Sequence, residues 1–212
     1  MLESTADLLS LSLGVLFHPI ETFDNIKKNR RFFSYIPVLV LLFAIFAARV
    51  ATIFLIHFPL ARGMTPETAN FVTELVKFVV PVVGWAISCY IVTSIMGGEC
   101  HFKEMLTASC YAMMPYILFS VPLALFSKVL SGSDRDVYGF LEFAMWAWVG
   151  LLFFLSVKTL NNYTFVKTVW ICVTGIIAMA IIIAVLVLVY AMINQLIQLI
   201  MNLLNEIRML NW

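Results

Sequence analysis

The stretch Met96–Pro122 reads M-G-G-E-C-H-F-K-E-M-L-T-A-S-C-Y-A-M-M-P-Y-I-L-F-S-V-P, and it decides the fold. A double glycine ends one apolar helix, a short charged loop follows, and the next apolar helix contains Pro115 and Pro122. A proline inside a helix removes a backbone hydrogen bond and costs about 3 kcal/mol in water. In a bilayer such prolines are tolerated, because neighbouring helices and hydroxyl side chains satisfy the freed carbonyls. We therefore predict a bent, membrane-spanning helix at the centre of the fold.

The composition of the whole chain is that of a membrane protein. Its 212 residues are 63% hydrophobic and only 12% charged, and the mean hydropathy is +1.01. Soluble domains carry about 25% charged residues. The formal net charge of +1 and the lack of a basic, aromatic-rich module argue against nucleic acid as a partner. The four cysteines lie on or beside apolar segments, which favours reduced thiols in the core.

Five apolar segments are long enough to cross a bilayer, for which about 20 residues are needed. We expect them at 35–57, 71–96, 105–129, 138–157 and 169–192. An odd number of spans places the two ends of the chain on opposite sides of the membrane. Lysine and arginine are concentrated just before the first span, so we expect the N-terminus in the cytoplasm and the C-terminus outside.

Amphipathic helices are expected on both sides of these spans. Residues 2–17 form a run too short to cross the membrane, and the acidic residues at its start do not fit a signal peptide. Residues 19–31 begin with proline and end with a basic cluster, so we interpret both segments as interfacial helices. After residue 193, Asn and Gln recur every three or four positions, which indicates a further amphipathic helix. This helix either continues the fifth span or lies in the outer interface, and the lack of Gly or Pro favours one long helix.

The predicted fold is therefore all-α, a polytopic protein of the plasma membrane with five transmembrane helices. We divide the chain into interfacial helices at 1–33, a transmembrane domain at 34–193 and an amphipathic C-terminal helix at 194–212. Helix kinks are expected at Pro81, Pro115 and Pro122. The basic cluster expected to touch anionic headgroups consists of Lys27, Lys28, Arg30 and Arg31.

Arg49 is the residue that most suggests a function within the membrane. It lies some 20 Å into the first span at about 1.5 Å per residue. A charge there costs several kcal/mol unless it is paired, hydrated or reaches the interface. Glu74 and Glu142 lie at a similar depth, and Lys77 is one turn from Glu74 and able to pair with it. A structural network of these four residues is favoured over a substrate or proton pathway, and both interpretations stay open.

The loop after the second span gathers polar groups, namely Glu99, Cys100, His101, Lys103 and Glu104. A zinc site built from Cys100, His101 and Cys110 would match no zinc spacing and would lack a fourth ligand. We therefore predict no metal and no other cofactor. The sequence also contains no hydrolase elbow, Walker A, zinc-protease or dinucleotide motif. A solvated loop that docks a partner is the favoured interpretation.

Three short motifs follow one another along the chain. They are F-H-P-I-E-T-F at Phe17–Phe23, G-G-E-C-H-F-K-E-M-L at Gly97–Leu106 and Y-A-M-M-P-Y-I at Tyr111–Ile117. Their order and spacing, together with the five spans, resemble the Yip1-domain family of membrane proteins, and most of all its bacterial branch. The resemblance marks Gly97, Gly98, Phe102, Tyr111 and Pro115 as family motif residues. The long tail striped with Asn and Gln departs from the family pattern.

The resemblance implies a function only in outline. Eukaryotic members act with Rab GTPases and shape secretory membranes, whereas bacterial members are often encoded beside ABC transporters, which implies an accessory subunit. Our leading hypothesis is a non-enzymatic accessory or scaffold protein that lies in the lipid bilayer against the permease subunits of an ABC transporter. Two alternatives stay open: a small transporter or lipid-handling protein with a polar cavity around Arg49, and a membrane-shaping protein.

Overall fold

The computed structural model describes residues 5–28, 35–56, 70–130 and 134–210, and its regular structure is helical. The helices are α1 (Thr5–Phe17), α2 (Pro19–Lys28), α3 (Tyr35–Leu55), α4 (Phe71–Ile95), α5 (Phe102–Ala112), α6 (Met114–Phe126), α7 (Arg135–Leu160) and α8 (Phe165–Leu210). Five segments among them are long and apolar enough to cross a membrane: α3, α4, α5 with α6, α7, and α8. The predicted all-α fold with five candidate spans is confirmed.

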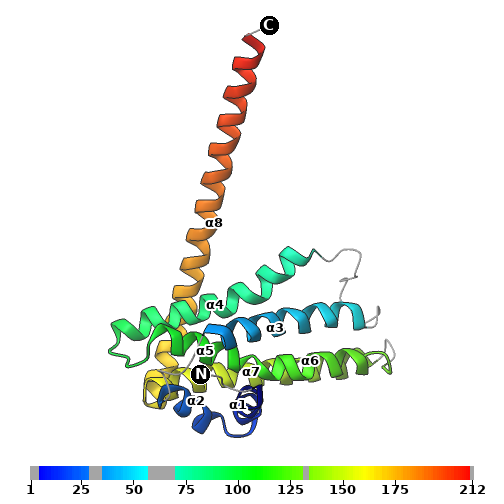
Figure 1. Ribbon diagram of the computed structural model, residues 1–212, viewed down its shortest axis with the longest axis vertical. Helices are drawn as coiled ribbons and strands as arrows, with labels where there is room; N and C mark the ends of the chain where they lie inside the picture. Colours follow the sequence, from blue (N-terminus) through cyan, green and yellow to red (C-terminus); the bar gives the residue numbers. More distant parts are fainter. Residues whose placement is uncertain (1–4, 29–34, 57–69, 131–133, 211–212) are drawn as a thin grey trace.

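Most of the candidate spans form a bundle, and α8 leaves it. Helices α3, α4, α6 and α7 run alongside one another, whereas α8 crosses α4 and projects far beyond the other helices (Figure 1). Helices α1 and α2 fold back onto the bundle, where α2 packs against α5 and α7 and α1 against α5 and α6. Half of the most apolar 18-residue window of α5–α6 is buried, compared with none of the corresponding window of α8. The bundle is therefore centred on α5.

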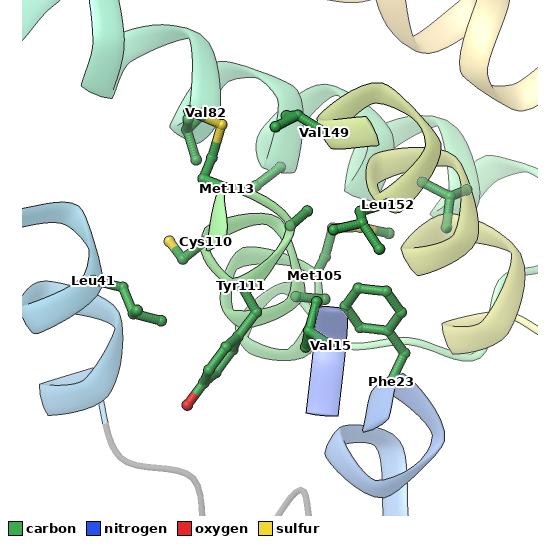
Figure 2. Packing of buried hydrophobic residues seen from close by; sticks show 14 of the residues in the cluster. Val15, Phe23, Leu41, Val82, Met105, Cys110, Tyr111, Met113, Val149 and Leu152 are labelled. Atoms are coloured by element: carbon green, nitrogen blue, oxygen red, sulfur yellow. The ribbon is translucent and has the colours of Figure 1, made fainter. Parts of the chain in front are cut away.

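Helix α5 lies at the centre of the hydrophobic core. Met105, Cys110 and Tyr111 have no exposed surface. Figure 2 shows side chains from α1, α2, α3, α4 and α7 converging on this helix. Within a bilayer, close van der Waals packing of such side chains holds the helices together. The small residues Ala108 and Ala112 are also fully buried on α5 and let the neighbouring helices approach closely.

The third span is interrupted beside its first proline. Helix α5 ends at Ala112, Met113 forms a turn, and α6 begins at Met114 with Pro115 in its first turn. A proline in the first turn of a helix costs little, because its missing N–H would have no partner there. Helices α4 and α6 remain continuous through Pro81 and Pro122.

Two glycines bring α8 into close contact with α4. A Cβ atom on Gly175 would lie 3.2 Å from Cys89 Sγ, and one on Gly84 would lie 3.7 Å from the side chain of Met179. The crossing of the two helices therefore depends on the missing side chain at Gly175. In contrast, a Cβ atom on Gly150 of α7 would meet no atom within 4 Å.

Helix α8 continues without interruption over 46 residues. At 1.5 Å per residue it is about 69 Å long, more than twice the ~30 Å hydrocarbon core of a bilayer. The expected division between a fifth span and a tail at residues 193 and 194 falls inside this continuous helix. A helix of this length spans the hydrocarbon core even when it is strongly tilted.

We predict that Gly175→Leu weakens the docking of α8 on α4. The added side chain would have to displace Cys89, and overpacking of this kind costs about 1–3 kcal/mol. The thermal unfolding midpoint of the purified protein in detergent, followed by tryptophan fluorescence, should fall. The matched variant Gly150→Leu should leave the midpoint unchanged, and equal midpoints for both variants would contradict the proposed close contact.

Candidate functional site

Two polar centres lie at opposite ends of the bundle, and the first contains Arg49. Arg49 Nε donates a hydrogen bond of 2.7 Å to Glu74 Oε2, and Lys77 Nζ lies 3.1 Å from Glu74 Oε1. The Arg49 and Glu74 side chains are 16% and 6% exposed, whereas that of Lys77 is 52% exposed. The sequence placed Glu74 at a depth similar to that of Arg49 and Lys77 one turn from Glu74, and the structure brings both cations into contact with the Glu74 carboxylate. We call this group the charge cluster.

Aromatic rings cover the charge cluster on its inner side. The Arg49 guanidinium carbon lies 4.8 Å from the centroid of the Phe78 ring, a distance at which a cation and an aromatic face attract each other. The ring centroid of Tyr116, on α6, lies 5.1 Å from that of Phe78 and 5.3 Å from that of Trp146, on α7. The cluster therefore joins α3 and α4, and its aromatic cover extends the contact to α6 and α7.

Glu142, the fourth predicted charge, lies on α7 one helical turn before Trp146. It is half-buried and close enough to Tyr116 to interact with it electrostatically. A cavity of about 710 Å³ opens next to the cluster between α4, α7 and α8. Lys77 and Phe78 lie on its wall, and nearly all the other lining residues are apolar or aromatic.

The second polar centre, which we call the loop platform, consists of residues 96–101 and 161–164. Gly97 has a φ of +71°, a conformation that favours glycine. A Cβ atom on Gly98 would lie 2.5 Å from Asn161 Oδ1 and 2.8 Å from the Tyr163 hydroxyl. Asn161 Oδ1 also accepts a hydrogen bond of 3.3 Å from the backbone N–H of Cys100. The two loops therefore pack directly against each other, and any side chain at residue 98 would have to displace Asn161 and Tyr163.

Helices on either side of the loop platform are tied to it by lysines. Lys27 of α2 lies 2.8 Å from Glu99 Oε2, although 72 residues separate them in the sequence. Lys167 of α8 donates a hydrogen bond of 3.2 Å to the Met96 carbonyl and lies 4.1 Å from the centroid of the Tyr163 ring. Thus α2, α4 and α8 meet at one surface, and their relative positions are fixed there.

Polar groups of the loop platform take part in local contacts that hold the fold together. His101 is the N-cap of α5, and its backbone N–H donates to Glu104 Oε2 at 3.1 Å. Burial raises the pKa of the Cys100 thiol, and hydrogen bonds with Thr93 and Asn161 offset only part of this effect. A thiol of this kind is a poor nucleophile. Within the described residues no three His, Cys, Asp or Glu side chains are placed to hold a metal ion.

The remaining predicted residues take different places in the structure. Lys27 is only 12% exposed in its pair with Glu99, whereas Lys28 is 69% exposed and lies 2.5 Å from Asp24. Arg30 and Arg31 of the predicted basic cluster lie outside the described residues. Among the motif residues, Tyr111 of α5 and Pro115 of α6 are buried. The ring centroid of Phe102 lies 5.6 Å from that of Tyr90.

Sequence reasoning missed the pairing of the two loops. In the sequence, Asn161 and Asn162 belong to a polar loop after the fourth predicted span, yet Asn161 accepts a hydrogen bond from Cys100 and Asn162 adopts a φ of +52°. The sequence did contain a signal for this contact. Two predicted spans, the third and the fourth, separate the two loops, so both loops lie on the same side of the membrane. Polar loops on one side of a compact bundle are candidates for mutual contact.

Comparison with protein families gives one match. The model described as the Yip1 domain matches residues 13–205, nearly the whole chain. No curated protein and no solved structure matches significantly.

We predict that Arg49→Leu destabilises the protein by about 3–5 kcal/mol, because it leaves the buried Glu74 carboxylate without its main partner. Chemical or thermal unfolding in detergent measures this loss. Adding Glu74→Gln to Arg49→Leu should restore part of it. Lys77→Leu, at the exposed member of the cluster, should cost no more than about 1 kcal/mol. An Arg49→Leu protein of unchanged stability would show that the pair does not support the fold.

We also predict that Gly98→Ala opens the contact between the two loops. In the parent protein Cys100 should react slowly with a maleimide at pH 7, because its thiol is buried and its pKa is raised. In Gly98→Ala the methyl group would displace Asn161 and Tyr163, and the modification of Cys100 measured by peptide mass spectrometry should accelerate. Gly139→Ala, whose Cβ would meet nothing within 4 Å, serves as the control and should leave the rate unchanged.

Proposed function

Because this chain belongs to the Yip1 domain family, we propose that it acts as a non-enzymatic accessory protein of the membrane, which holds a partner complex at its loop platform. The partner that we propose is the permease part of an ABC transporter, because the sequence resembles the bacterial branch of the family, whose members are often encoded beside such transporters. The chain is a Yip1-family membrane protein with five candidate transmembrane helices in its described part.

The observation that supports this proposal is the construction of the loop platform. Its buried groups are occupied in holding three helices together, while Glu99 and His101 expose 63% and 67% of their side chains. Rigid loops that present exposed polar groups are typical of binding surfaces. A preorganised surface also binds at a lower cost in conformational entropy than a loose one.

The charge cluster supports the non-enzymatic part of the proposal. Arg49 and Glu74 pair with each other at 2.7 Å, and Lys77 shares the same carboxylate. Charges paired in this way inside a span join helices, which is the structural role that the sequence favoured.

A second candidate function is lipid handling, and the cavity between α4, α7 and α8 favours it. Its volume of about 710 Å³ lies within the ~300–1,000 Å³ range of small-molecule sites. Its apolar wall suits an acyl chain, and Lys77 at its edge offers a charge to a headgroup. Membrane shaping has less support, because Phe23 and Ile26 of α2 are buried in the protein and Ile20 is the one large apolar side chain of α2 that stays exposed.

We predict that the tagged chain co-purifies with permease and ATPase subunits in a mild detergent from its native host. The double variant His101→Ala with Asn162→Gly should lose these subunits, because it trims two exposed side chains of the loop platform. Glycine accepts the positive φ of residue 162, so the backbone conformation should persist. Mass spectrometry of the bound proteins measures the loss.

The matched control is Arg135→Ala with Asp136→Ala, two exposed residues at the start of α7, at the other end of the bundle. This variant should retain the partner. Purification of the parent chain with no other membrane protein would overturn the proposal and shift attention to the lipid cavity.

A further inference from the structure

The C-terminal half of α8 exposes a row of large apolar side chains. Ile193, Leu196 and Ile200 are 52%, 61% and 46% exposed. This half of the helix projects away from the bundle (Figure 1), and no residue of the most apolar 18-residue window of α8 is buried. A helix that exposes this much apolar surface requires either lipid or another protein around it.

The spacing of these residues is that of a coiled coil. Leu186, Val189, Ile193, Leu196 and Ile200 follow one another at intervals of three, four, three and four residues. In heptad terms Ile193 and Ile200 occupy a positions, and Val189 and Leu196 occupy d positions. The sequence continues this spacing at Leu203, Ile207 and Leu210. From Ile193 onward a β-branched residue at a is followed by leucine at d, the pattern that favours parallel, two-stranded coiled coils, whereas Leu186 and Val189 reverse it.

The polar residues of this segment lie on the opposite face. In the same register Asn194 occupies position b, Gln195 and Asn202 occupy position c, and Gln198 occupies position f. Positions b, c and f point away from the partner helix in a coiled coil. One face of the helix is therefore suited to water, and the other is suited to an apolar helix. Ile197 and Leu199, at positions e and g, widen the apolar face.

Lipid alone does not account for this pattern. A helix immersed only in hydrocarbon gains nothing from a stripe of four carboxamides, which prefer water or a polar partner. A helix lying flat on the membrane would have to bend away from the spanning part of α8. Sharp bends occur at proline, glycine or similar interruptions, and neither residue occurs after Gly175. At about 69 Å, α8 is also long enough to extend beyond the hydrocarbon core.

We propose that α8 pairs with α8 of a second copy of this chain, through a seam that includes Leu186, Val189, Ile193, Leu196 and Ile200. The repeating seam is complementary to itself, so an identical helix fits it. Copies inserted in the same orientation carry α8 across the membrane in the same direction, which gives the parallel pairing that the a and d residues favour. The loop platform takes no part in this pairing, so the inference does not depend on the function proposed above.

Cysteine cross-linking of the full chain in native membranes tests the pairing. Ile193→Cys and Ile200→Cys would each place two thiols across the seam, within the 4.4–6.8 Å Cα separation that a disulfide needs. Mild oxidation should convert most of each variant to a covalent dimer. Gln198→Cys, on the opposite face, should give several-fold less dimer. The parent chain supplies the background, because Cys89, Cys100 and Cys110 are buried and Cys172 is half-buried.

Two differently tagged copies of Ile200→Cys, expressed together, identify the occupant of the seam. A cross-linked species that carries both tags supports the pairing. A cross-link to a different protein, equal yields at residues 198 and 200, or no dimer at either seam position would each overturn it. Loss of the transporter subunits in a pull-down with retained cross-linking would reject the proposed function and leave the pairing intact.

Discussion

A charge inside a membrane span has to be neutralised where it lies, and this constraint sets α3 against α4. Arg49 and Glu74 come from different helices and are both largely buried, so the two helices cannot slide past each other without separating the pair. Lys77 shares the carboxylate from the more exposed side. The rings of Phe78 and Tyr116 then extend this contact from α4 to α6. One arginine thus accounts for the arrangement of several helices.

The other end of the bundle uses backbone geometry in place of charge. Gly98 lacks a side chain where Asn161 and Tyr163 approach, and Asn161 Oδ1 accepts a hydrogen bond from the backbone N–H of Cys100. Between the two centres lies α5, whose buried Met105 and Tyr111 contact the surrounding helices. The resulting bundle is rigid at both ends, which suits a protein that presents a fixed surface.

Features that depend on local composition could be predicted from the sequence, and features that depend on tertiary contacts could not. Apolar runs of about 20 residues identify spans, because the thickness of the bilayer sets their length. Depth within a span allowed Arg49 and Glu74 to be placed together. In contrast, Lys27 looked like a headgroup contact, because nothing in its neighbourhood indicates Glu99, 72 residues away. The direction of α8 relative to the bundle could not be predicted from the sequence either, since it depends on how Gly175 packs against Cys89.

The bundle and α8 differ in where their contacts are made. The ion pairs of the charge cluster and of the loop platform are made within one chain, and neither needs a second copy. Helix α8 is different, because its apolar seam and its carboxamide stripe are both satisfied only when one face meets a helix and the other meets water. A helix surrounded only by lipid does not need a regular spacing of its apolar residues. Along α8, however, apolar residues recur at intervals of three and four residues, which define a heptad register. The register therefore argues that association is encoded in α8, and that the bundle supplies the surface that association brings together.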